Sequence, residues 1–306
     1  MTDATVGAPV THHLRLLSGH RPAHVLCAWG LTSLLPGATL HFAGTWGEPV
    51  LTWAGSPRQL ADQAATQMVA RLWDLGSGPL AGIRTTTPPR KDINRVVAQA
   101  WREVRTGADL PKASVIRTFD LAGSTARTAR GGGELKVPAA ALTLLTGKGY
   151  TAKAAQDMWG LLGARTEQEA RQRASEEILL LLGGAVTVAE AKPGLRFSAS
   201  AMMPRTTSGS ETCDVQPVVD LLALCGQMLI EPAQRTVTEA GLRKGLMWFL
   251  HPVPLTIEAV VDLHESPPSG VPWPRRSARI LTERTAKFSY LSPSEPVAQP
   301  NGEDHA

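Results

Sequence analysis

The chain has 306 residues, of which 43% are hydrophobic and 19% are charged, and its formal net charge is +4 at pH 7. This composition can build one large or two modest cores and predicts a globular protein. The chain does not open with a basic segment followed by an apolar run. Its apolar stretches, 178–182 and 215–230, are too short or are interrupted by Asp220, which excludes a membrane span. We therefore expect a cytoplasmic protein without membrane contact.

The cysteines exclude two further classes of protein. Cys27, Cys213 and Cys225 lie in separate segments and form no C-x-x-C pair, so neither a zinc site nor a disulfide framework is indicated. We expect them to be small buried residues, and the sequence calls for no cofactor.

The first quarter of the chain predicts a strand, a buried helix, a hairpin and a capped helix. Alternation predicts the strand at 12–17, and continuous apolar residues after Pro22 predict the buried helix. The hairpin strands are expected at 38–42 and 49–53, around two glycines. Ser56-Pro57 is a typical helix start, and that helix should run to Gly76.

The middle of the chain predicts more helices and short strands. Helices are expected at 92–105, 138–145 and 151–162, and a strand is expected at 113–121. Thr166 and Glu169 have the spacing of a capping box and should open another helix. Two strands, 185–190 and 195–201, are expected around a Lys-Pro-Gly turn, with a Ser/Thr-rich connector at 202–214.

The most apolar part of the chain, 217–261, is expected to form the centre of the core. It predicts a helix that ends near Gly226, a strand at 246–251 and a second helix opened by Pro254. A late strand is expected within 278–290, after a proline-rich loop. The mixture indicates an α+β fold. We expect an N-terminal region at 1–205, a C-terminal region at 206–292 and a disordered tail at 293–306, with a boundary weak enough that one domain remains an alternative.

Motifs that would identify an enzyme are missing from the sequence. There is no G-x-S-x-G elbow, no H-E-x-x-H and no Walker motif. His12 and His13 are adjacent and cannot share a metal from one helix face. His251 and Asp120 are the candidates for an enzyme alternative, but the expected roles are a satisfied core histidine and a lone acid. We expect a protein that is not an enzyme.

Basic residues cluster unevenly along the chain, which suits a phosphate-bearing partner. Trp273 lies between prolines beside one cluster. Its ring could stack on a base if it is exposed, or fill the core if it is buried. Trp29, Trp101, Trp159 and Trp248 are expected in the core. The glycine-rich segment around 127–136 is expected to be a mobile surface loop, with a phosphate cradle as the alternative. The candidate nucleic-acid contacts are Arg84, Arg90, Lys91, Arg127, Arg130, Lys136, Trp273, Arg275 and Arg276.

Two segments resemble a known family. Residues 19–35, GHRPAHVLCAWGLTSLL, resemble the Asn-Pro and small-residue helix that opens subunits of the large-subunit-like Csb family in type I-U (I-G) CRISPR effector complexes. Residues 217–232, followed by LMWFLHPVPLTIEAVV, are similar to that family's apolar helix, tryptophan strand and proline-led helix. Arg21 stands in place of the family's asparagine, and Met228 to Glu231 replace its aromatic and arginine.

The resemblance implies a non-catalytic subunit of a crRNA-guided surveillance complex. Such a subunit would contact the crRNA and target DNA, touch other effector-complex subunits, and help to present the target to a helicase-nuclease. The alternatives are a small-molecule enzyme that uses His251 or Asp120, and an assembly scaffold that binds only proteins.

Overall fold

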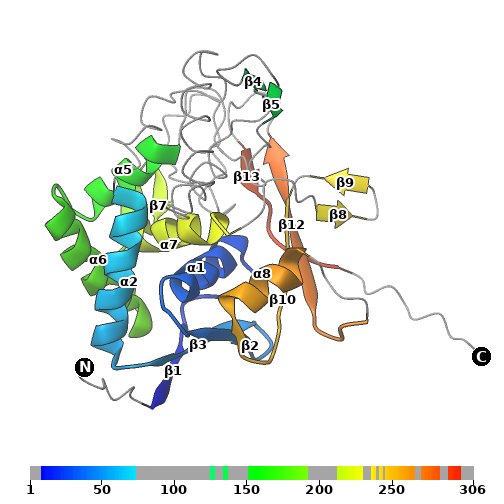
Figure 1. Cartoon of the computed structure of the whole chain (residues 1–306), viewed down its shortest axis with the longest axis horizontal. Coiled ribbons are helices and arrows are strands. Elements are labelled where there is room, and N and C mark those ends of the chain that lie inside the picture. Colours follow the sequence, from blue (N-terminus) through cyan, green and yellow to red (C-terminus); the bar gives the residue numbers. More distant parts are fainter. Residues whose placement is uncertain are drawn as a thin grey trace, which may run out of the picture.

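The computed structural model describes residues 8–73, 125–127, 134–136, 151–191, 212–229, 236–238, 241–243, 245–265, 270–282 and 289–297. Helices and antiparallel strands are mixed along these segments (Figure 1), which confirms the predicted α+β class. The helices are α1 (Pro22–Ser33), α2 (Pro57–Leu72), α5 (Thr151–Leu161), α6 (Glu167–Leu182), α7 (Pro217–Gln227) and α8 (Ile257–Glu265). Within the described segments, no helix is both long and apolar enough to cross a bilayer.

One four-stranded antiparallel sheet has the strand order β1-β3-β2-β11. Its strands are β1 (Pro9–His13), β2 (Thr39–Ala43), β3 (Glu48–Ala54) and β11 (Leu255–Thr256). The predicted hairpin is confirmed, because β2 and β3 pair from Ala43 opposite Glu48 to Thr39 opposite Thr52. Gly44 and Gly47, in the turn between them, have φ angles of 65° and 59°, a region that favours glycine.

A second antiparallel sheet has the order β10-β12-β13, with β14 also paired to β12. Its strands are β10 (Gly245–Phe249), β12 (Arg275–Thr282), β13 (Ser289–Leu291) and β14 (Glu295–Pro296). Three two-stranded pairs complete the strands: β4 (Thr125–Arg127) with β5 (Glu134–Lys136), β6 (Ala189–Ala191) with β7 (Cys213–Val215), and β8 (Thr236–Thr238) with β9 (Gly241–Arg243).

The two most apolar helices, α1 and α7, cross at a pair of glycines. A Cβ placed on Gly30 would lie 1.8 Å from the backbone oxygen of Leu222, and one on Gly226 would lie 2.0 Å from that of Leu26. Only glycine lets the two backbones approach this closely. Cys27 and Cys225 are fully buried in these helices, as predicted, whereas Cys213 is half-buried.

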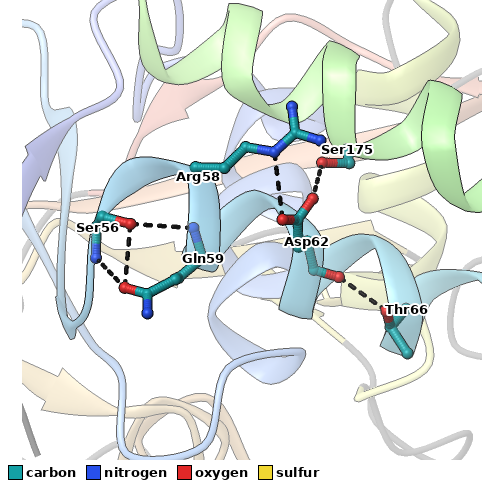
Figure 2. A network of polar contacts seen from close by, with 6 residues as sticks. All are labelled: Ser56, Arg58, Gln59, Asp62, Thr66 and Ser175. Carbon is teal, nitrogen blue, oxygen red and sulfur yellow. Dashed lines mark hydrogen bonds and ion pairs between the residues drawn. The ribbon is translucent and has the colours of Figure 1, made fainter.

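Helices α2 and α6 lie side by side at the edge of the core (Figure 1). Both begin with complete capping boxes, Ser56 with Gln59 and Thr166 with Glu169, so both predicted helix starts are confirmed. Figure 2 shows the contact between them, where the Ser175 hydroxyl donates to an Asp62 carboxylate oxygen at 2.5 Å. The capping boxes therefore define where α2 and α6 begin, and the Ser175–Asp62 hydrogen bond joins the two helices.

The structure corrects several predicted element bounds. The first strand covers residues 9–13, and the chain then turns, with the Leu17 amide donating to the Leu14 carbonyl at 2.8 Å. Pro254 does not open a helix directly, since β11 intervenes and α8 begins at Ile257. Strand β6 pairs with β7, which lies partly inside the predicted connector. Sequence patterns mark local propensity, whereas strand pairing depends on distant partners.

The end of the chain adds further corrections. The late strand predicted within 278–290 forms as β12 and β13, and β12 already begins at Arg275. Residues 295–296, assigned by sequence to a disordered tail, form β14 opposite Arg276 and Ser277. The helices predicted at 92–105 and 138–145 and the strands at 113–121 and 195–201 lie outside the described residues.

Candidate nucleic-acid interface

The predicted contact residues fall into three groups in the structure. Trp273, Arg275 and Arg276 lie together where β12 begins. Arg127 and Lys136 belong to the β4–β5 hairpin, whose register places Arg127 opposite Glu134 and Thr125 opposite Lys136. The remaining four residues, Arg84, Arg90, Lys91 and Arg130, lie outside the described residues.

Arg275 and Arg276 line a cavity of about 510 Å³, which we call the arginine groove. Five segments build it: the loop before α1, β2 with the β2–β3 turn, the residues after β10, the chain around the start of β12, and β14 with the residue after it. Its volume lies within the range of about 300–1,000 Å³ that is typical of ligand sites. The lining residues are His20, Phe42, Gly44, Thr45, Gly47, Leu250, Pro252, Pro274, Arg275, Arg276, Pro296 and Val297.

Both arginines are positioned by neighbouring groups. The Arg276 guanidinium donates from Nε to the Ser294 hydroxyl at 2.7 Å and from Nη2 to the Ser294 carbonyl at 3.0 Å. Those bonds use two of its five N–H donors. The Arg275 guanidinium carbon lies 4.6 Å from the centre of the Phe249 ring, a cation–π geometry. Both cations are therefore held at the groove without a carboxylate partner in these contacts.

The β2–β3 turn, which contributes Gly44, Thr45 and Gly47 to the groove, presents Trp46, whose residue surface is 75% exposed. Its backbone is fixed, because the Ser18 hydroxyl donates to the Trp46 carbonyl at 3.0 Å and the Gly19 amide donates to the Gly47 carbonyl at 2.7 Å. The indole lies 5.9 Å from the His20 ring. An exposed aromatic ring on a pinned turn is suited to stacking.

The groove is tied to the core beneath it. Trp248, 1% exposed, donates its indole N–H to the Gly19 carbonyl at 2.8 Å. A Cβ on Gly19 would meet Leu250 at 2.5 Å and the Gly47 carbonyl at 2.8 Å, so this wall also depends on a glycine. Trp29, Trp159 and Trp248 are buried, as predicted, and the predicted core residue Trp101 lies outside the described residues.

Charge in the groove comes from the arginines. Burial, followed by the nearby Arg276 charge, lowers the pKa of His20, and burial lowers the pKa of Arg276 from its ordinary value. At pH 7 His20 is therefore mainly neutral, whereas an arginine remains a cation. The site combines fixed positive charge with apolar walls.

His251 and Asp120 are the residues predicted for an enzyme alternative, and His251 lies in the core. His251 is 1% exposed, bonds to the Val253 carbonyl through Nδ1 at 3.0 Å, and contacts the rings of Phe42 and Trp273. Burial lowers the pKa of His251 to about 4. It is a core histidine beneath the groove. Asp120 lies outside the described residues, and in the part of the chain that is described no group of three or more His, Cys, Asp or Glu residues could hold a metal ion.

Sequence patterns did not predict His20 and Trp46 as residues of the candidate site. The available signal was a tryptophan flanked by Thr and glycines in a predicted hairpin, which indicates an exposed ring. Its approach to the His20 ring depends on the fold and has no local signature. Comparisons of the chain with protein-family models, with curated proteins and with solved structures find no match.

Proposed function

We propose that this chain is a cytoplasmic, non-catalytic nucleic-acid-binding subunit of a crRNA-guided type I CRISPR surveillance complex. In this role it contacts target DNA or crRNA, binds other effector subunits and helps to present the target to the helicase-nuclease. The observation that carries the proposal is the arginine groove, where Arg275 and Arg276 line a cavity beside the turn that carries the exposed Trp46. Arginines and aromatic rings are the groups that hold a nucleic-acid backbone and its bases.

The place of the family-like segments supports the same proposal. Helices α1 and α7, which contain most of the residues that resemble the Csb family, pack directly on each other at Gly30 and Gly226. Strand β10 and helix α8 continue the second segment, and β10 pairs with the arginine-bearing β12. The residues of the resemblance thus form one core, and the groove lies at its edge.

Copurification tests the role in a complex. The full-length chain, tagged and expressed with its neighbouring genes, should purify with other proteins and with RNA of uniform length. Recovery of a monomer free of nucleic acid would contradict the proposal.

Salt-dependent binding tests the groove itself. The double variant Arg275→Gln/Arg276→Gln should bind nucleic acid more weakly, and the slope of log affinity against log salt should flatten by about 1.4–1.8, for two lost phosphate contacts. The matched control is Arg171→Gln/Arg173→Gln on α6, whose arginines are exposed and paired with Glu167 and Glu176. An equal effect of both double variants would remove the groove from the site.

The two alternatives make different predictions. An enzyme would require His251 to reach a substrate, yet its side chain is buried and does not line the groove. Turnover by the isolated chain would favour this alternative. A protein-only scaffold would bind effector subunits normally after the arginine substitutions and would show no salt-dependent affinity for nucleic acid.

A further inference from the structure

We infer that the arginine groove accepts a single-stranded segment, with one unstacked base against Trp46 and the adjoining phosphates on Arg275 and Arg276. This inference depends on the proposed function and deepens it, since it specifies the form of nucleic acid that the site selects. Its evidence is the shape of the cavity, the exposure of the indole and the placement of charge.

The cavity walls have the chemistry of a base pocket. Six of its lining residues are apolar: Phe42, Leu250, Pro252, Pro274, Pro296 and Val297. A base offers an apolar face to such walls and to an exposed indole, irrespective of its identity. Because the backbone of the Trp46 turn is held by Ser18 and Gly19, little ordering of the chain is needed when the base arrives.

Charge favours a phosphate chain over an apolar peptide. Arg275 and Arg276 lie at the same end of β12 and both line the cavity. The neighbouring carboxylates are engaged elsewhere: Glu295 with Arg279 at 3.4 Å, and Glu48 with His13 at 2.7 Å. The two arginines therefore carry positive charge that these carboxylates do not cancel, which suits consecutive phosphates.

A duplex fits this arrangement poorly. In a double helix the bases are stacked on one another and paired, so no base face is free to meet Trp46. Entry of one base into the cavity would require that base to be unpaired and unstacked, which is unfavourable. A single strand pays little of this cost, and it can place a base in the cavity while its phosphates reach the arginines.

The test compares a fluorescein-labelled twelve-nucleotide dT strand with a twelve-base-pair duplex, using the full-length chain and anisotropy at fixed salt. We expect the single strand to bind at least about tenfold more tightly than the duplex. Trp46→Ala should weaken single-strand binding by about tenfold, and Trp46→Phe should retain most of the affinity because it keeps an aromatic face. The control Leu180→Ala, an exposed apolar residue on α6, should change nothing.

Each other outcome overturns the inference. Equal affinity for the duplex would contradict it while leaving the proposed function intact. Unchanged binding by Trp46→Ala would remove the stacking role, and polyglutamate that competes as well as unlabelled dT would show that the groove recognises acidic peptides. Absence of binding to either nucleic acid would overturn both the inference and the proposed function. Because Trp46 is exposed, a thermal unfolding scan should show its variants folded as well as the parent.

Discussion

The helical core and the arginine groove differ in how their elements meet. At the α1–α7 crossing, Gly30 and Gly226 bring two backbones into contact and leave no space. At the groove, five separate segments meet around a cavity of about 510 Å³, and the hydrogen bond from Trp248 to the Gly19 carbonyl joins two of the neighbouring elements. The helix crossing is closely packed, whereas the groove contains an accessible cavity.

This difference separates stability from recognition. Close packing gives the core its stability but leaves no surface for a ligand. The groove contributes fewer apolar contacts and keeps donors and an aromatic ring accessible. Substitutions in the core should therefore change the free energy of unfolding, whereas substitutions at the groove should change binding with little effect on folding.

The largest expected effect is at the helix crossing. Gly226→Ala places a methyl group 2.0 Å from the Leu26 carbonyl and should lower the free energy of unfolding by about 3 kcal/mol or more, measured by urea denaturation. The control is Gly160→Ala in α5, where no atom lies within 4 Å of the new Cβ; it should stabilise the helix by up to about 1 kcal/mol. Similar losses from both variants would contradict the close crossing.

Acidic pH should lower the free energy of unfolding, because His251 is buried between the core and the groove. Burial lowers the pKa of His251 to about 4 in the folded chain, whereas an unfolded histidine titrates near 6.5. The unfolded state therefore takes up a proton first, and stability falls as the pH drops from about 6.5 towards 4. For His251 the loss between pH 7 and pH 5 is about 2 kcal/mol.

The variant His251→Asn tests whether His251 causes this loss of stability at low pH. Asparagine can still donate a hydrogen bond towards the Val253 carbonyl, but it does not titrate. Urea unfolding at pH 7 and pH 5 should show a smaller difference in the variant, by about 2 kcal/mol. An unchanged difference would assign the acid sensitivity to other groups, such as the buried His24, whose pKa burial also lowers to about 4.

A third prediction concerns the β4–β5 hairpin. Replacing Arg127, Arg130 and Lys136 together with glutamine should weaken target-DNA binding by about tenfold and flatten its salt slope by about 2–3, as expected for three phosphate contacts. The measurement is a filter-binding series over salt concentration. An unchanged affinity and slope would remove this hairpin from the interface and leave the arginine groove as the remaining candidate.

The smallest effect is expected at Ser294. Ser294→Ala removes the hydroxyl that accepts from Arg276 and donates to the His20 carbonyl, and it should cost about 1 kcal/mol of stability. Binding should weaken a few-fold, because the guanidinium is less firmly placed. Ser33→Ala, which removes a hydroxyl bonded to Arg71 away from the groove, should cost similar stability without changing binding.

Much of the local structure could be predicted because its signals are local. Proline at the start of α1 and α7, and the capping boxes of α2 and α6, act within one helical turn. Alternation around Gly44 and Gly47 was sufficient for the hairpin. The pairing of β6 with β7 and of β14 with β12 could not be predicted, since those short strands form only where a partner supplies hydrogen bonds.

The candidate site was predicted in part. Arg275, Arg276 and Trp273 were identified from a basic cluster beside an aromatic ring. For Trp273 the sequence left base stacking and core packing open, and the residue is half-buried, with its ring 6.2 Å from that of His251. Trp46 and His20 come from segments more than 200 residues away from β12. Their approach depends on the antiparallel register and the Trp248–Gly19 bond, which leave no periodic trace in the sequence.

The sequence by itself determined the mixed class, the helices of the described segments, the hairpin and the apolar identity of the central core, because helical periodicity, caps and turn residues act over a few positions. Only the tertiary structure decided that Gly30 meets Gly226 and that two arginines line a cavity beside the turn of an exposed tryptophan. Those relations join residues distant along the chain, and they arise from packing and strand pairing that no short segment specifies alone.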